Sequence, residues 1–179
     1  MPNSQPISQR VTLERIAEAD RALIDGLAQF YIYDFSEMSP ISDTDFDIGP
    51  DGRFGDLPGI DDIWRDDCAI PFAIRYECRV AGFILIDNHS HRDGGFVERN
   101  MSEFFVARQF RRQGVGEEAL RQVLTAFPGR WEVAVVARNT AAKSFWPRAI
   151  AAAANVSGLT CVEGDRAHWT GPIWCFDAA

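Results

Sequence analysis

Phe104-Phe105-Val106-Ala107-Arg108-Gln109-Phe110-Arg111-Arg112-Gln113-Gly114-Val115-Gly116-Glu117 is an apolar run, a basic turn and two glycines that begin a helix. Apolar residues then recur at helical spacing until Pro128-Gly129 ends the pattern. Gly114 and Gly116 have no Cβ, so a ligand can approach this turn closely. The first N–H groups of a helix lack internal partners and favour negative charge, to which three arginines of the turn add. The stretch therefore predicts a phosphate or pyrophosphate site.

Several phosphate-binding motifs compete for this turn. No Gly-Lys-Ser/Thr follows, which excludes a Walker loop. Gly114-x-Gly116-x-x-Ala119 fits the dinucleotide fingerprint, but there the strand runs straight into the first glycine, whereas here a polar turn, residues 108–114, intervenes. Arg111-x-x-Gly114-x-Gly116 resembles the pyrophosphate-binding motif of the GCN5-related N-acetyltransferases (GNAT family). An arginine-flanked helix start on a solvated surface is the remaining alternative.

The next 30 residues extend the resemblance. Residues 131–137 are typical of a buried strand, because β-branched residues fill them. Asn139 then suits the N-cap of a second helix. The family has an Asn at this point, an Ala three residues later and an aromatic pair further on, here Ala142 and Phe145-Trp146. Strand, glycine turn, helix, strand and Asn-initiated helix in this order identify the chain as a member of the family.

Composition sets the class of protein. We expect one domain over residues 1–179, with 46% hydrophobic residues and no apolar run near the ~20 residues of a membrane span. The N-terminus lacks the pattern of a signal peptide, which favours a cytoplasmic protein. The four cysteines have no zinc-site spacing and are predicted to be buried thiols. His89-x-His91 is interpreted as part of a solvated loop, so we expect no metal site.

The remaining elements follow from periodicity. Residues 11–30 are predicted as a helix, with Val11 closing a short strand before it, and a second short helix is expected to end near Pro40. Residues 70–86 indicate an antiparallel hairpin, and residues 96–106 continue the meander. Two strands at 159–163 and 168–176 end the chain. The fold class is α/β, a GNAT-like mixed and mostly antiparallel sheet flanked by helices.

A long acidic loop separates the early helices from the hairpin. Residues 34–67 hold eleven acidic residues against two arginines, a local net charge of −9 in a chain of net charge −8. Glycines and prolines break any regular element there, although apolar residues such as Leu57 and Ile60 indicate that part of the loop packs down. A solvated insertion is one interpretation. The other interpretation is that the loop covers the binding site of the molecule that accepts the acetyl group, and that its charge attracts a cationic amine.

The resemblance implies direct transfer of an acetyl group from acetyl-CoA to a primary amine. The amine must lose a proton, and the oxyanion needs a donor, for which a backbone N–H near Phe105 or Val106 is suited. Glu103 is the candidate base, because strand alternation puts it on the face shared with Phe105. A merely solvated Glu103 is the alternative, and Glu98 and the acidic loop compete for the role.

The resemblance also assigns binding residues. Those expected to hold acetyl-CoA are Phe105, Val106, Arg111, Arg112, Gln113, Gly114, Val115, Gly116, Asn139 and Lys143. Those expected to wall the acceptor site are Tyr31, Tyr33 and Trp64, with core packing as the alternative for the tyrosines. We expect a small-molecule amine as the partner, with neither nucleic acid nor membrane, and leave a homodimer open.

One position departs from the family pattern. Many members have a Tyr seven residues after the helix-starting Asn, where it donates a proton to the leaving thiolate; this chain has Trp146. Pro147 follows and predicts a kink or an end of the helix. Either the thiolate leaves unassisted or another residue protonates it. A non-catalytic acyl-CoA-binding sensor or partner module is therefore the alternative to an N-acetyltransferase.

Overall fold

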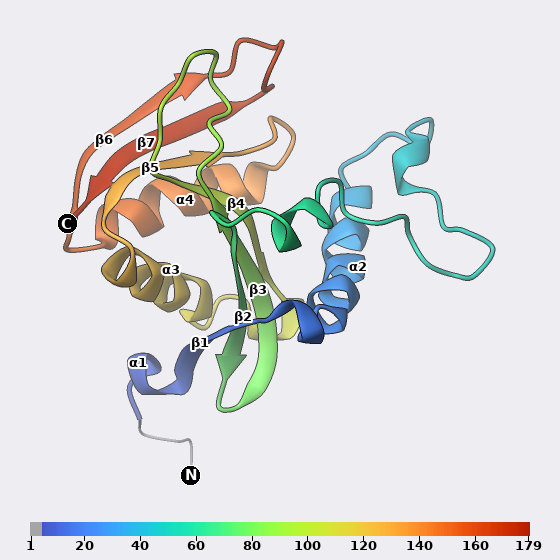
Figure 1. Ribbon diagram of the computed structural model, residues 1–179, viewed down its shortest axis with the longest axis horizontal. Helices are drawn as coiled ribbons and strands as arrows, with labels where there is room; N and C mark the ends of the chain where they lie inside the picture. The colour runs from blue at the N-terminus through green and yellow to red at the C-terminus, as the bar shows by residue number, and fades with distance from the viewer. Residues whose placement is uncertain (1–4) are drawn as a thin grey trace.

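The computed structural model describes residues 5–179 and contains a seven-stranded sheet in the order β1-β2-β3-β4-β5-β7-β6 (Figure 1). Neighbouring strands are antiparallel except β4 and β5, which are parallel. The elements are α1 (Ile7–Arg10), β1 (Val11–Arg15), η1 (Glu18–Asp20), α2 (Ala22–Ser36), η2 (Thr44–Phe46), η3 (Asp62–Trp64), β2 (Ile70–Tyr76), β3 (Arg79–Asp87), β4 (Arg99–Val106), η4 (Arg108–Phe110), α3 (Val115–Ala126), β5 (Gly129–Ala134), α4 (Thr140–Ala152), β6 (Val156–Glu163) and β7 (Pro172–Ala178). This is the mixed, mostly antiparallel α/β fold that the sequence predicts.

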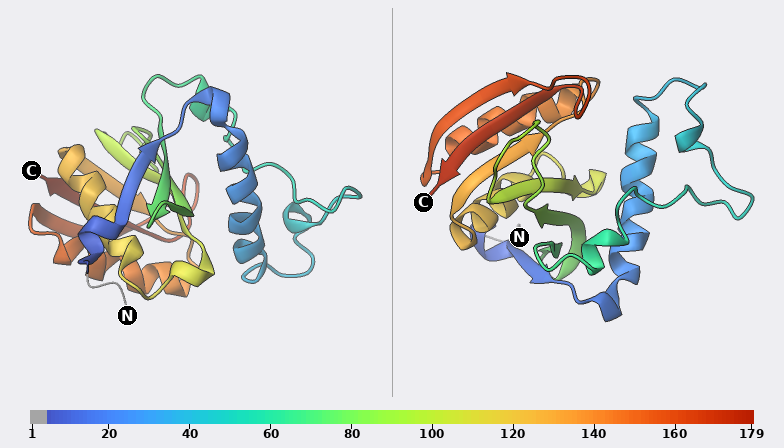
Figure 2. Two further views of the ribbon diagram at one scale, coloured as in Figure 1. Left: turned by 90° about the horizontal axis from the view of Figure 1, so that it is seen from below. Right: turned by 45° about the horizontal axis from the view of Figure 1, so that its top comes forward.

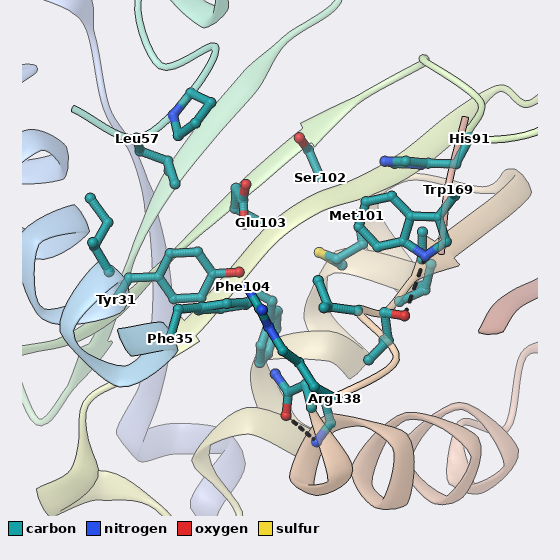
Figure 3. Close-up of a pocket in the computed structure, with 18 of the residues that line it drawn as sticks. Tyr31, Phe35, Leu57, His91, Met101, Ser102, Glu103, Phe104, Arg138 and Trp169 are labelled. Carbon is teal, nitrogen blue, oxygen red and sulfur yellow. Dashed lines mark hydrogen bonds between the residues drawn. The ribbon is translucent and has the colours of Figure 1, made fainter. Parts of the chain in front are cut away.

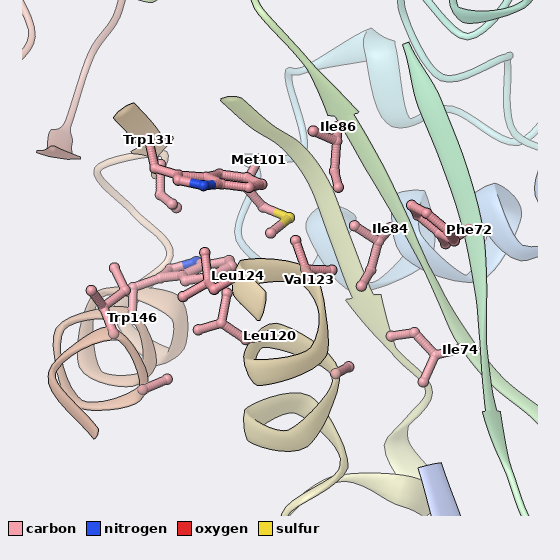
Figure 4. Packing of buried hydrophobic residues seen from close by; sticks show 14 of the residues in the cluster. Phe72, Ile74, Ile84, Ile86, Met101, Leu120, Val123, Leu124, Trp131 and Trp146 are labelled. Atoms are coloured by element: carbon pink, nitrogen blue, oxygen red, sulfur yellow. The ribbon is translucent and has the colours of Figure 1, made fainter. Parts of the chain in front are cut away.

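Helices cover both faces of the sheet. Figures 1 and 2 show α2 on one face and α3 with α4 on the other. The α3 and α4 face holds the larger hydrophobic cluster, in which Trp131 stacks on Phe176 and Leu120 and Leu124 are nearly inaccessible (Figure 4). On the other face, Ile24 of α2 is buried in a smaller hydrophobic cluster, which also contains residues of β3 and β4. The sheet is thus sandwiched between two apolar layers.

The β2–β3 hairpin agrees with its prediction. Its strands end at Tyr76 and resume at Arg79, so the turn consists of Glu77 and Cys78. Both turn residues have positive φ, at 48° and 66°, which is the backbone that two-residue hairpin turns require. The strand predicted before the glycine turn is β4, and the helix after it is α3.

The prediction for the N-terminal region is wrong in its element types. Instead of a helix over residues 11–30, Val11–Arg15 forms edge strand β1, which pairs with β2 from Val11 opposite Tyr76. Instead of two helices there is one, α2, which continues through the predicted break near Phe30 to Ser36. Pairing with β2 overrides the helical periodicity of the strand residues, because an edge strand needs only one buried side chain, here Val11, to fit.

Two smaller expectations concern the cysteines and Pro147. Cys68, Cys78 and Cys161 are exposed and Cys175 is half-buried, so the prediction of buried thiols is wrong. Of the kink or helix end expected at Pro147, the end does not occur, because α4 runs on to Ala152. Proline removes one backbone hydrogen bond there, and burial of the following residues, Ala149 and Ile150, holds the last turns against the core.

The acidic loop begins within the last turn of α2 and reaches almost to β2 (Figure 1). Two single 3₁₀ turns, η2 and η3, are its only regular elements within residues 37–67. Leu57 and Ile60 are buried against the α2 cluster, whereas Ile48 is exposed. The buried apolar residues of the loop therefore hold parts of it against α2, while most of the aspartates of the loop lie at the surface.

Candidate functional site

The basic turn between β4 and α3 takes an unusual backbone course. Arg112 has φ 58°, and Gly114, the N-cap residue, has φ 78° in the left-handed region. A Cβ at Gly114 would lie 3.6 Å from Ile7 Cγ1, which is an ordinary contact distance. Glycine is therefore needed at this position for its positive φ and not for lack of space. The N–H groups of the first turn of α3 have no partners within the helix. The turn presents these donors beside its arginines.

Strands β4 and β5 separate beside this turn. They pair only at Arg99 with Trp131 and at Asn100 with Glu132, and no pairing with β5 follows further along β4. The β4 backbone from Met101 to Val106 is thus hydrogen-bonded to β3 on one side only. The free side of a strand is a ready template for an extended, amide-containing ligand.

A groove runs along this free strand side to the helices. We call it the β4–α4 groove; its volume is ≈ 550 Å³. Its lining residues come from α2, from the end of β4 with the basic turn, and from α4: Tyr31, Asp34, Phe35, Glu37, Met38, Phe104, Phe105, Val106, Arg108, Arg111, Arg112, Gly116, Asn139, Ala141, Ala142, Ser144, Phe145, Trp146 and Arg148.

Gly116 is the glycine that keeps the β4–α4 groove open. A Cβ at this position would lie 3.4 Å from Phe145 Cζ and 3.5 Å from Phe104 Cε1. Branched side chains there would fill the space between the first turn of α3 and the two rings. Close approach to the backbone is thus possible at Gly116, which lines the groove, whereas Gly114 does not line it.

Arginines of the basic turn are paired across the groove with α2. Arg108 Nε donates to Asp34 Oδ1 at 2.9 Å, and Arg111 forms an ion pair with the other oxygen of Asp34. Arg111 Nε also donates to the carbonyl oxygen of Val106. These contacts fix the positive charge of the turn at the groove mouth, in reach of a polyanionic ligand.

Asn139 and Trp146 shape the opposite wall. The Asn139 side chain accepts from the N–H of Ala142 at 2.9 Å, which confirms its N-cap role. Trp146 is 5% exposed, and its ring meets Phe104 edge-on with ring centroids 5.1 Å apart. The tryptophan therefore packs as part of the wall.

A second pocket, of ≈ 610 Å³, opens on the α2 side of β4; we call it the Glu103 pocket (Figure 3). Its walls are α2, the acidic loop, the β3–β4 connection, β4, β5 and the segment after it, α4 and the β6–β7 connection. The lining residues are Tyr31, Ile32, Phe35, Asp45, Phe46, Gly55, Asp56, Leu57, Pro58, His91, Met101, Ser102, Glu103, Phe104, Val133, Ala134, Val135, Val136, Arg138, Asn139, Ala142, Trp146 and Trp169.

A β-bulge aims Glu103 into this pocket. Leu85 pairs with Glu103 but the next residue, Ile86, pairs with Met101, so Ser102 has no partner in the ladder. Bulges of this kind re-aim side chains and are common beside active sites. Glu103 and Phe105 both lie on the α2 side, as alternation predicts: Glu103 faces the pocket, and Phe105 belongs to the α2 cluster.

Glu103 has a perturbed acidity. Burial raises the pKa of Glu103 to about 7, although the Tyr31 hydroxyl and His91 oppose the rise. Burial, and next the charge of Glu103, raise the pKa of Tyr31 well above its usual value. In Figure 3 the Tyr31 hydroxyl points toward the same part of the pocket as Glu103. Near neutral pH, Glu103 can therefore both lose and accept a proton while Tyr31 stays protonated.

The Glu103 pocket and the β4–α4 groove adjoin each other. Six residues line both spaces: Tyr31, Phe35, Phe104, Asn139, Ala142 and Trp146. A ligand in the groove can therefore present a reactive end to a second molecule in the pocket, close to Glu103. This arrangement suits group transfer between two bound molecules.

The predicted site residues fall into two groups. Glu103 and Tyr31 line the Glu103 pocket, and the expected cofactor residues that line the β4–α4 groove are Phe105, Val106, Arg111, Arg112, Gly116 and Asn139. Gln113, Gly114, Val115 and Lys143 are not among the residues that line the groove. Val115 is 1% exposed in the core, and Gln113 donates to the carbonyl oxygen of Gln109, so both support the turn.

Two of the expected acceptor residues also lie outside the pockets. Tyr33 is exposed on α2 beside Phe54 and under the guanidinium of Arg108. Trp64 packs in the α2 cluster, below Arg21.

Sequence reasoning misses a part of the Glu103 pocket. The pattern around His91 predicts a solvated loop, and Asp45, Asp56, Arg138 and Trp169 carry no motif. These residues are remote from one another in the chain, and only the fold brings them to one cavity. The available signal, the charge of the acidic loop, indicates the region but not the residues.

Neither a membrane span nor a metal cluster is apparent in the described part of the chain. None of the helices within residues 5–179 has the length and apolar content that crossing a bilayer requires. Within the same residues, no group of three or more His, Cys, Asp or Glu side chains is placed to hold a metal ion.

Comparison with known proteins gives the family. A search of curated proteins found no match. Among solved structures, an acetyltransferase from Thermus thermophilus is 15% identical, with a TM-score of 0.61 over 95% of this chain and 97% of that one. A GNAT-family acetyltransferase from Staphylococcus aureus is 9% identical, with a TM-score of 0.58 over 92% and 97%.

A third similar structure contains ligands. The microcin C7 self-immunity acetyltransferase MccE, solved with acetyl-CoA and AMP, is 12% identical, with a TM-score of 0.55 over 98% of this chain and 96% of that one. At such identities these likenesses show the fold. The model of the acetyltransferase (GNAT) family itself matches residues 33–150, well over half of the chain. The chain therefore belongs to the GNAT acetyltransferase family and is an acyltransferase whose co-substrate is acetyl-CoA.

Proposed function

We propose that this enzyme transfers the acetyl group to the primary amine of a small cationic acceptor, with Glu103 as the proton acceptor. One observation carries the proposal: the β4–α4 groove and the Glu103 pocket share walls, and a carboxyl group of raised pKa lies in the pocket. Acetyl-CoA supplies a thioester whose carbonyl carbon an amine can attack.

The β4–α4 groove fits the co-substrate. The open space at Gly116 lets phosphates reach the unpaired N–H groups of α3, and Arg111 and Arg112 face the same space. The free side of β4 offers amide groups to the pantetheine arm. Gln113, Gly114 and Val115 hold the turn in shape. Asn139, which lines the groove at the start of α4, is the proposed contact of the arm, and Lys143, outside the groove lining, is proposed to reach the phosphates with its long side chain.

Glu103 is suited to take a proton from the amine at neutral pH. With the pKa raised to about 7, an appreciable fraction is ionised at pH 7, and the ionised form is more basic than an ordinary carboxylate. A backbone N–H near Phe105 or Val106, on the free side of β4, is the proposed oxyanion donor. Tyr31, which lines both spaces, is the hydroxyl best placed to donate to the leaving sulfur in place of Trp146.

The acceptor end of the Glu103 pocket favours a cation. Asp45 and Asp56, from two parts of the acidic loop, line it together with Phe46. The one lining arginine, Arg138, lies 3.7 Å from Asp43, which offsets its charge. A cleft of one sign concentrates ligands of the opposite sign. These residues support the interpretation that the acidic loop covers the acceptor site. Tyr31 remains the proposed wall, with Tyr33 and Trp64 supporting α2 and the loop.

Release of free CoA thiol tests the proposal. Acetyl-CoA is incubated with a panel of di- and polyamines, amino alcohols and amino acids matched in size, with and without protein. We expect turnover to be highest with acceptors that carry a second positive charge. If anionic or neutral-bodied amines are the best acceptors, the cationic assignment is wrong. Binding of acetyl-CoA without turnover across the panel would favour the alternative, an acyl-CoA-binding module.

A further inference from the structure

His91 is a titratable residue of the Glu103 pocket to which the proposed function gives no role. It lies in the connection between β3 and β4, and its side chain is 26% exposed. Its ring meets the indole of Trp169 edge-on, with centroids 4.5 Å apart. In Figure 3 a ring nitrogen of His91 points past Ser102 toward the middle of the pocket.

The other ring nitrogen faces a buried carboxylate. His91 Nδ1 lies 3.4 Å from Oε1 of Glu132, a fully buried residue of β5. Nδ1 is itself buried and makes no regular hydrogen bond within residues 5–179. Because Nδ1 faces Glu132, the nitrogen that points into the pocket is Nε2. A carboxylate beside one imidazole nitrogen holds the proton there and leaves the other nitrogen free to accept one.

Glu132 is built to hold this loop in place. Its oxygens accept from the His91 backbone N–H at 2.6 Å, from Ser90 Oγ at 2.9 Å and from Arg92 Nε at 3.0 Å. Although burial alone raises the pKa of Glu132, hydrogen bonds from His91, Ser90 and Arg92 lower it to about 2. Glu132 therefore remains an anion at every pH at which the enzyme is expected to work.

The chemistry of the acetyl transfer requires that two protons leave the amine nitrogen, so a second proton acceptor has a role. An acceptor ammonium first gives up one proton. Its nitrogen then forms a bond to the acetyl carbon, the carbon–sulfur bond breaks, the nitrogen gives up a second proton and the CoA sulfur takes one. One proton is released overall, but two leave the nitrogen. Glu103 can receive only one of them at a time.

We propose that His91, held by buried Glu132, is a second proton acceptor in the acceptor pocket, whose Nε2 takes one of the two protons that leave the amine nitrogen. This inference rests on the proposed N-acetyltransferase function. Glu132 acts as a positioning residue: it fixes the tautomer and stabilises the imidazolium that forms. His91 and Glu103 both line the pocket, and the two groups are close enough for the charge of His91 to act on Glu103.

Several other charges act on His91. Glu132 and Arg92 lie on its buried side, and the titratable or charged residues that line the pocket with it are Tyr31, Asp45, Asp56, Glu103 and Arg138. The charge on His91 lowers the pKa of Glu103. Removal of His91 should therefore move the ionisation of Glu103 to higher pH.

The pH dependence of kcat/KM tests the proposal. If both groups must be unprotonated, log kcat/KM of the native enzyme falls toward low pH with a limiting slope of two. We expect His91→Gln to lower kcat/KM about 10²-fold, the low end for loss of a general base. It should also reduce the limiting slope to one and move the remaining ionisation upward. A native slope of one, or a variant with unchanged slope, overturns the proposal.

His89→Gln is the matched control in the same connection. His89 is exposed, 3.7 Å from Asp66 and 3.8 Å from Asp87, and it does not line the pocket. We expect kcat/KM within about twofold of the native value, as for an ordinary surface substitution, and an unchanged slope. If His89→Gln and His91→Gln lose activity equally, the loss comes from the loop and the proposal is wrong.

The tautomer of His91 gives a readout that needs no turnover. The protein has three histidines, and loss of a signal in His91→Gln assigns its ring nitrogens in ¹⁵N NMR spectra. We expect neutral His91 to have its proton on Nδ1, and expect Glu132→Gln to shift the population toward Nε2–H. Native His91 with the proton on Nε2 overturns the inference alone. No turnover by the native enzyme with any amine overturns the proposed function, whatever the tautomer.

Discussion

The β4–α4 groove and the Glu103 pocket share a wall but are assembled differently. Apart from the α2 side, the groove is lined by two short stretches, residues 104–116 and 139–148. The pocket takes its lining from α2, the acidic loop, His91, β4, β5 and the segment after it, α4 and Trp169. A binding site for a constant ligand can be encoded locally, as a turn that presents backbone donors. A site for a variable acceptor is assembled from loops that only the fold brings together.

The largest expected effect breaks the groove and leaves the pocket intact. Gly116→Val places a branched side chain against Phe145 and Phe104, in the space where we propose that the phosphates of acetyl-CoA approach. Loss of two or more charge-assisted hydrogen bonds should weaken acetyl-CoA binding by at least about 10²-fold. Isothermal titration calorimetry measures this directly. Unchanged affinity would place the pyrophosphate elsewhere.

Gly26→Val is the matched control for that change. Gly26 also lies in a helix, α2, and a Cβ there would meet nothing within 4 Å. The control introduces the same valine in a helix without filling the groove. We expect native affinity for acetyl-CoA from Gly26→Val, and native-like circular dichroism spectra from both variants.

The next effect breaks the chemistry of the pocket without touching the groove. Glu103→Gln keeps the shape of the side chain but cannot accept the proton, so kcat should fall roughly 10²-fold. Affinity for acetyl-CoA should stay within about twofold of the native value, because Glu103 does not line the groove. Stopped assays of thiol release and calorimetry give the two quantities. An unaffected rate from pH 6 to 9 would remove Glu103 from the mechanism.

Sequence patterns predict the groove better than the pocket for a physical reason. Gly116, Arg111 and Asn139, which line the groove, belong to motifs whose spacing is set within a few residues, so the sequence alone predicts them as binding residues. Glu103, which lines the pocket, is predicted from strand alternation, which is also local. His91 and Trp169 are separated by almost 80 residues and become neighbours only when β5 and β7 pair.

The N-terminal misassignment has the same origin. Leu13 falls at helical spacing with Ile16 and Ala17, but the state of Val11–Arg15 is decided by β2, about 60 residues later in the chain. Exposed Cys161 in the edge strand β6 likewise could not be placed without knowing that β6 has a neighbour on only one side. Local patterns thus predict those elements whose partners lie close in sequence.

A third prediction concerns the stability cost of the pocket. The folded-state pKa of Glu103 is about 7 against 4.5 for an ordinary Glu side chain, so folding disfavours the ionised form. The penalty is absent below the unfolded-state pKa and complete above pH 7. The shift corresponds to roughly 3 kcal/mol at most, and partial solvent access reduces this to about 1–2 kcal/mol. Glu103→Gln should be more stable than the native protein by that amount at pH 8.

Urea unfolding at pH 5 and pH 8 measures this difference. At pH 5 most Glu103 is protonated in the folded protein, and the gap between variant and native protein should be much smaller. A gap that is equal at the two pH values would mean that Glu103 is not desolvated. If Glu103→Gln is both more stable and less active than the native protein, the pocket is a site where the catalytic group destabilises the fold. The groove is not expected to show this opposition.

The smallest effect distinguishes the acidic loop as a cover from the loop as a surface. The sequence predicts only that the loop as a whole attracts a cation, whereas the structure shows that Asp45 and Asp56 are its aspartates that line the Glu103 pocket. Asp45→Asn/Asp56→Asn should lower kcat/KM for a dicationic acceptor about threefold to tenfold, within the usual range for electrostatic attraction. For a monoamine without a second charge the effect should be smaller.

Asp62→Asn/Asp67→Asn changes the net charge equally at two exposed positions outside the pocket. At an ionic strength of about 0.01 M the Debye length is ~30 Å, so both double variants should bind the dication less readily. At about 0.15 M it is ~8 Å, and only charges in the pocket still act on the acceptor. The defect of the pocket variant should therefore persist at 0.15 M, whereas that of the surface variant should disappear. If the two variants respond to salt alike, the aspartates of the loop act only through net charge, and the loop has no role as a cover for a cationic acceptor.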